Sequence, residues 1–78
     1  MITVKYFGAI AEQTGSQVEK ISFSKISLSD FLAVLEQKYQ LNNRTFTVAV
    51  NQKMVENPGN YLLESEDVIA LLPPFAGG

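Results

Sequence analysis

The sequence predicts a small α+β domain in which one helix packs on a mixed sheet of about five strands. Two patterns support this. Apolar residues alternate with other residues in segments typical of half-buried strands, and one central segment repeats its apolar residues at helical spacing. The length points the same way, because 78 residues suffice for one domain with a thin stability margin.

The first part of the chain predicts two strands joined by a short helical segment. Residues 2–7 alternate and end at a glycine, residues 8–15 suit a single helical turn between two glycines, and residues 17–23 suit a second strand. Phe7 falls on the face opposite to the core residues of the first strand. The core residues expected in these strands are Ile2, Val4, Tyr6, Ile21 and Phe23.

Residues 27–39 predict the main helix. Ser27 suits the N-cap, and Asp30 three residues later gives a start similar to a capping box. The apolar residues that form one stripe along this helix are Leu28, Phe31, Leu32, Leu35 and Tyr39.

The second half of the chain predicts three further strands. Residues 46–50 alternate, a tight turn at Asn51-Gln52 leads into a short strand at 53–55, and residues 67–72 form the last strand. Residues 56–60 have the composition of a loop. This order of elements matches the β-grasp, or ubiquitin-like, architecture.

The composition excludes several classes of function. The chain has no cysteine and no histidine, so disulfides, thiolate metal sites and histidine chemistry are absent. Its net charge is −2 and its cations are not clustered, which argues against nucleic acid or an anionic membrane as the partner. No apolar run is long enough to span a membrane, and the first residues form a strand pattern and no signal peptide. We therefore expect a cytoplasmic protein without a bound metal or cofactor.

Some apolar residues are not explained by a core on one side of the sheet. Phe7, Met54, Leu72 and Phe75 occupy positions where exposure is expected. Twist or bulges could turn single residues inward, and isolated exposed apolar residues need no explanation. A cluster of them beside the end of the chain would instead mark a protein interface.

The last six residues differ from the domain at 1–72. Residues 73–78 read Pro-Pro-Phe-Ala-Gly-Gly. Proline has no N–H and a fixed φ, so the pair stops sheet pairing and favours a stiff stalk. Glycines let a backbone pass through a narrow channel. The pattern predicts a tail that delivers a carboxyl group to another protein, with an ordinary frayed terminus as the alternative.

Together these residues resemble the small-subunit branch of the MoaD/ThiS sulfur-carrier family, the small subunit of molybdopterin synthase. The resemblance runs along the whole chain. Its most specific part is the end, from Glu66 to Gly78, where the proline pair stands before Phe-Ala-Gly-Gly. Many family members have an arginine where this chain has Ala11, which leaves a charged contact of the first loop without support.

The resemblance implies a mechanism. An E1-like activating enzyme would use ATP to adenylate Gly78, and a sulfurtransferase would supply the sulfur for a thiocarboxylate. The tail, with Gly77 before the reactive end, would enter the large subunit of molybdopterin synthase and donate sulfur to cyclic pyranopterin monophosphate, within a heterotetramer. The positions that would contact partners are Phe7, Met54, Leu72, Pro73, Pro74, Phe75 and Ala76.

Three other functions remain open from the residues alone. The chain could carry sulfur for thiamin synthesis or tRNA thiolation. It could be a protein modifier whose Gly78 forms isopeptide bonds with lysines. It could also be an interaction module whose tail does no chemistry.

Overall fold

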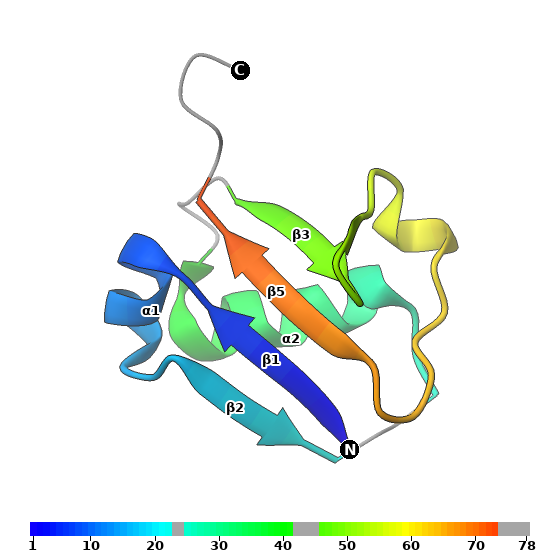
Figure 1. Ribbon diagram of the computed structural model, residues 1–78, viewed down its shortest axis with the longest axis horizontal. Helices are drawn as coiled ribbons and strands as arrows, with labels where there is room; N and C mark the ends of the chain where they lie inside the picture. The colour runs from blue at the N-terminus through cyan, green and yellow to red at the C-terminus, as the bar shows by residue number, and fades with distance from the viewer. Residues whose placement is uncertain (23–24, 42–45, 74–78) are drawn as a thin grey trace.

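The computed structural model has a five-stranded sheet with one long helix packed across one face (Figure 1). It describes residues 1–22, 25–41 and 46–73. The elements are β1 (Ile2–Tyr6), α1 (Gly8–Thr14), β2 (Val18–Ile21), α2 (Leu28–Tyr39), β3 (Thr47–Val50), β4 (Lys53–Met54), the 3-10 helix η2 (Pro58–Asn60) and β5 (Val68–Leu72). This is the predicted α+β, β-grasp arrangement.

The strands lie in the order β2-β1-β5-β3-β4. β1 and β5 are parallel neighbours, and the other three pairs are antiparallel, so the sheet is mixed as predicted. Figure 1 shows β5 between β1 and β3, with α2 behind the sheet. The pair β1–β5 therefore joins the first and the last strand of the sequence.

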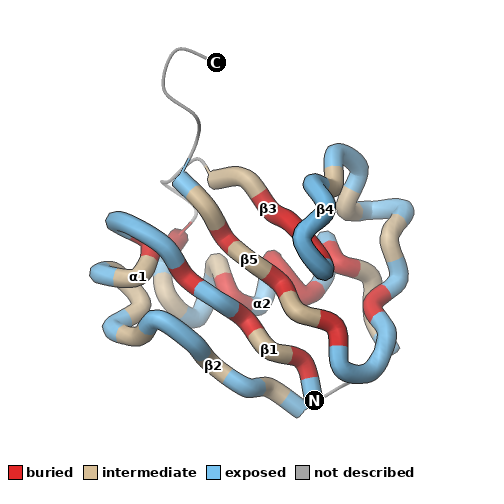
Figure 2. Tube along the Cα trace, in the orientation of Figure 1, coloured by how far each residue is buried: buried red, intermediate tan, exposed pale blue. Residues whose placement is uncertain are grey.

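The core lies between the sheet and α2. Alternate residues of β1 and β5 are buried, which Figure 2 shows as red segments along both strands. This confirms the predicted inward face of the first strand. The residues of these strands, β3 and α2 that form the buried core cluster are Ile2, Val4, Tyr6, Ile69, Leu71, Val48, Val50, Leu28, Phe31, Leu32 and Leu35.

Helix α2 begins and ends as its sequence predicts. The Ser27 hydroxyl accepts a hydrogen bond from the Asp30 N–H at 3.2 Å, which satisfies one of the unpaired donors of the first turn. At the other end Gln40 adopts a left-handed conformation, and its N–H donates to the Glu36 carbonyl. Leu41 follows and is buried, which anchors this end of the helix in the core.

Three local predictions were wrong. Residues 8–15 form more than a single turn, because Ile10 is buried and holds the seven-residue α1 against the core. Residues 56–60 are not all loop, because Pro58 begins the 3-10 helix η2 and its carbonyl accepts from the Tyr61 N–H. The second strand is shorter than predicted and ends at Ile21, which is half-buried against the core. The other strand ends differ from the prediction by a residue. Phe23 lies outside the described residues.

A polar cluster attaches the edge strand β2 to α2. The Glu19 carboxylate accepts hydrogen bonds from the hydroxyls of Tyr6 (2.7 Å) and Tyr39 (2.6 Å). Lys38 donates to its other oxygen at 2.8 Å. The rings of Tyr6 and Tyr39 also meet edge to face, with centroids 5.9 Å apart. These contacts fix the position of β2, which has only one neighbouring strand.

The cluster changes the acidity of its members. Burial raises the pKa of the Tyr6 hydroxyl, and the hydrogen bond to Glu19 raises it further. For Glu19, burial raises the pKa, but the hydrogen bonds from Lys38, Tyr39 and Tyr6 outweigh it and lower the pKa below its ordinary value. The folded state therefore favours the charged carboxylate.

We expect Glu19→Gln to lower the free energy of unfolding at neutral pH by about 1–3 kcal/mol, because hydrogen bonds to a charged carboxylate are stronger than those to an amide. The folded pKa of Glu19 is depressed, so its contribution is present above the unfolded value and is lost as the pH falls through the folded pKa. Urea titrations from neutral pH to about pH 3 should show the gap between wild type and variant closing. Glu12→Gln, on an exposed part of α1, is the control. An equal gap at every pH would contradict this account.

Candidate functional site

The sheet face opposite α2, here called the outer face, carries a row of side chains across all five strands. The register places neighbouring residues of this row opposite one another, on the same side of the sheet. In spatial order the row consists of Val18, Lys5, Ala70, Ala49 and Met54. Apart from the lysine, the row is apolar.

A second row lies closer to the C-terminal ends of β1 and β5. Phe7 comes one residue after the Tyr6–Leu71 pair, so it stands next to Leu72, which pairs with Thr47 of β3. Phe7 is 42% exposed and Leu72 is half-buried. The structure thus brings together two of the residues predicted to contact a partner, at the point where the chain leaves the sheet.

A shallow hollow on the outer face borders this corner. Its lining combines Lys5 of β1, the ring of Phe7 and apolar side chains of β5 with the amides of the turn that joins β3 and β4. The residues around it are Lys5, Phe7, Asn51, Gln52, Val68 and Ala70. Sequence reasoning found Phe7 but missed Lys5, Val68 and Ala70. The alternation in each strand indicates their face, but only the pairing of β1 with β5 places them together.

The outer face is positive although the chain is negative overall. Among the strand residues on this face are Lys5 of β1 and Lys20 of β2, which pairs with Thr3. None of the eight acidic residues of the chain lies on this face within the strands. The arrangement fits a partner surface that is mainly apolar and carries an acidic group opposite Lys5.

The turn beside the hollow is held by a buried carboxylate. Asn51 and Gln52 both have positive φ, 51° and 70°, which confirms the predicted turn. The Asn51 side chain donates to Asp67 at 2.9 Å and accepts from the Val68 N–H at 3.0 Å. Asp67 is only 6% exposed and also accepts from the Glu64 N–H at 2.8 Å. These bonds fix the turn to the start of β5.

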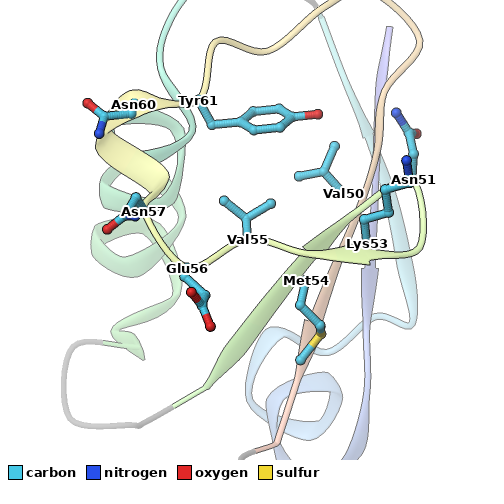
Figure 3. Close-up of a pocket in the computed structure, with 9 residues that line it drawn as sticks. All are labelled: Val50, Asn51, Lys53, Met54, Val55, Glu56, Asn57, Asn60 and Tyr61. Atoms are coloured by element: carbon cyan, nitrogen blue, oxygen red, sulfur yellow. The ribbon is translucent and has the colours of Figure 1, made fainter.

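Met54 lies on the outer face but apart from Phe7 and Leu72. It belongs to the edge strand β4 and pairs with Ala49, and it is 49% exposed. In Figure 3 its side chain points away from Val50, Val55 and Tyr61, with which it lines a second hollow. Within the described residues, the predicted patch therefore consists of two separate parts of one face.

The tail begins at Pro73, the last described residue. Pro73 is exposed, and its ring lies against Gly8, at the start of α1. Ala11 of the same helix is half-buried against the core. The remaining predicted tail residues lie outside the described part of the chain, so their roles stay predictions: Pro74, Phe75, Ala76, Gly77 and Gly78.

Within the described part of the chain no group of three or more histidine, cysteine, aspartate or glutamate side chains could hold a metal ion. Its helices also include none that is long and apolar enough to cross a membrane.

Comparison with known proteins relates this chain to small ubiquitin-like carriers. Residues 4–78 match the family model described as the ThiS family. The chain is 30% identical to one in the complex of subunits 1 and 2 of molybdopterin-converting factor from Helicobacter pylori, with a TM-score of 0.72 over 99% of this chain and 97% of that one.

Two further solved structures share the fold. One is a Pyrococcus furiosus protein provisionally named molybdopterin converting factor, subunit 1 (20% identity, TM-score 0.84, 95% of this chain and 97% of that one). The other is small archaeal modifier protein 1 of Haloferax volcanii (21% identity, TM-score 0.80, 95% and 97%).

We expect Asn51→Ala to lower the free energy of unfolding by about 2–3 kcal/mol, because it leaves the buried Asp67 with one bond fewer and removes the acceptor for the Val68 N–H. Gln52→Ala is the matched control. It places alanine at a similar positive φ but removes no side-chain hydrogen bond within the described part of the chain. Urea denaturation of both variants gives the difference, and equal losses would show that backbone strain alone explains the effect.

Proposed function

This chain belongs to the ThiS family of ubiquitin-like sulfur carriers, and we propose that its carrier group is the carboxyl group of Gly78. The observation that carries the proposal is the junction of two features. The apolar outer face reaches the corner formed by Phe7 and Leu72, and from this corner Pro73 leads into the Pro-Phe-Ala-Gly-Gly sequence. The proposed docking surface, the outer face, thus borders the point from which the chain continues to the Gly78 carboxyl group.

We propose further that the carrier serves as the small subunit of a molybdopterin synthase. The H. pylori relative, in complex with subunit 2 of molybdopterin-converting factor, supports this choice over thiamin synthesis or tRNA thiolation. The large subunit would bind the outer face and receive the tail, in a heterotetramer of two small and two large subunits. The acceptor of the sulfur would be cyclic pyranopterin monophosphate. Because activation consumes ATP, we place the reaction in the cytoplasm.

The chemistry begins with activation of a poor acyl group. The Gly78 carboxylate attacks the α-phosphorus of ATP on an E1-like enzyme, which forms an acyl adenylate and releases pyrophosphate. A sulfide-level nucleophile from a sulfurtransferase then attacks the carbonyl carbon and displaces AMP, leaving a thiocarboxylate. The chain has no cysteine and no histidine, the side chain best suited to proton transfer at neutral pH, so we do not assign to it the acid or base of these steps. Those groups belong to its partners.

The residues of this chain bind and position. Gly77 and Gly78 carry no side chains, so the end of the tail fits a channel that a Cβ would block. We propose that Pro74 stiffens the stalk and that Phe75 and Ala76 contact the wall of the channel. Met54 extends the docking surface to the far edge of the sheet.

We expect deletion of Gly78, or addition of one alanine after it, to abolish ATP–pyrophosphate exchange by the activating enzyme, because the reactive carboxyl group no longer reaches the α-phosphorus. One alanine added before Met1 is the control, since the exposed ion pair of Met1 with Glu66 contributes little. Normal exchange by both tail variants would overturn the proposal. Exchange followed by isopeptide bonds to lysines, with no thiocarboxylate, would identify a protein modifier instead.

We expect Lys5→Glu to weaken binding to the large subunit by about tenfold, because it places a negative charge in the centre of the outer face. Lys25→Glu makes the same charge change at an exposed position outside the strands. Isothermal titration calorimetry on the folded variants measures both. Equal affinities of the two variants would show that the outer face is not the docking surface.

A further inference from the structure

Gly8 is in close contact with the first residue of the tail. A Cβ placed on Gly8 would lie 2.8 Å from the Cγ atom of Pro73, closer than real carbon atoms approach. Gly8 also has a φ of +59°, which residues with a side chain rarely adopt. The contact with Pro73 therefore favours glycine at this position, and the positive φ adds to that preference. The proline ring fills the space left by the missing side chain.

The hydrogen bonds between β1 and β5 explain why the chain leaves the sheet after Leu72. In the parallel ladder Thr3 donates its N–H to Asp67, and Phe7 donates its N–H to Leu71 at 3.2 Å. The next bond of this series would run from the N–H of residue 73 to the Phe7 carbonyl. Residue 73 is proline and has no N–H. The Phe7 carbonyl instead accepts from the Ile10 N–H at 3.2 Å, in the first turn of α1.

We propose that Gly8 is a positioning residue for the tail. The ring of Pro73 packs against the Cα atom of Gly8, which carries no side chain, and this contact sets the direction in which the tail leaves the sheet. Pro73 ends the ladder, and Gly8 fixes where the proline ring lies once the ladder has ended. The consequence for sulfur transfer rests on the proposed function, whereas the geometric role does not. A tail whose first residue is held in place loses less conformational entropy when it enters a partner's channel.

Gly15 provides a matched comparison within the same helix. It ends α1 with a φ of +78°, and its N–H donates to the Ala11 carbonyl. A Cβ on Gly15 would meet no atom within 4 Å. Gly15→Ala therefore adds the backbone strain alone, and Gly8→Ala adds a similar strain together with a collision with Pro73.

The geometric role is tested by NMR. In the wild-type chain we expect a nuclear Overhauser effect between the Gly8 α-protons and the ring protons of Pro73. The chain has no cysteine, so a spin label on Glu12→Cys in α1 is unique. Gly8→Ala should change the paramagnetic broadening of the amides at 75–78, and Gly15→Ala should leave it as in wild type. Absence of the Overhauser effect, or equal changes of the broadening in both variants, would overturn the proposal. The Overhauser effect is measured on the wild-type chain, so this test does not depend on the folding of a variant.

The functional consequence is tested with the activating enzyme and ATP. We expect Gly8→Ala to lower kcat for pyrophosphate exchange by roughly 10- to 100-fold, because the carboxyl group is misplaced, with KM within about twofold, because the outer face still docks. Gly15→Ala should keep both constants after correction for the folded fraction. Pro73→Ala removes the ring that the new Cβ strikes, so Gly8→Ala with Pro73→Ala should be no slower than Pro73→Ala alone.

These outcomes separate the two proposals. If the wild-type chain supports no exchange, the proposed function fails, and the NMR experiment still decides the role of Gly8. If the wild type is active and the double variant shows the losses of both single variants added together, Gly8 does not act through Pro73 and the inference fails.

Discussion

The parallel pairing of β1 with β5 is the constraint on which the rest of the structure depends. It places the first and last strands of the sequence side by side in the middle of the sheet. Both strands therefore contribute buried side chains to the sheet face that packs against α2. It also makes both strands end at one corner. Phe7, Leu72, Gly8 and Pro73 meet there because the strands run in the same direction. In an antiparallel pair the end of β5 would lie beside the start of β1, away from Phe7.

The same sheet must remain stable while one face stays available. Small side chains help to satisfy both demands, because Ala70 and Ala49 lie in the middle of the outer row and Ala70 lines the hollow there. Polar contacts then hold the parts that the core does not reach. Glu19 attaches the edge strand to α2, and Asp67 attaches the β3–β4 turn to β5. A domain this small has little other means of fixing its edges.

Local patterns predicted the parts of this fold that depend on local chemistry. The helical repeat and Ser27 gave α2, and alternation gave the inward face of β1. The length of α1 could not be predicted, because it depends on burial of Ile10 by elements distant in sequence. The sequence patterns likewise did not predict the hollow or the contact of Pro73 with Gly8. Each requires knowledge of which strands pair, and a glycine after a strand does not reveal what fills its missing side chain.

The central claim is that this domain exists to present a sulfur-bearing C-terminus on a docking face. Its most direct test is the intact mass of the chain purified from its own cells, with fragmentation of the C-terminal peptide. The account predicts a species with one sulfur in place of one oxygen, located at Gly78. Only the free carboxylate, even after incubation with a competent activating enzyme, ATP and a sulfur donor, would contradict it.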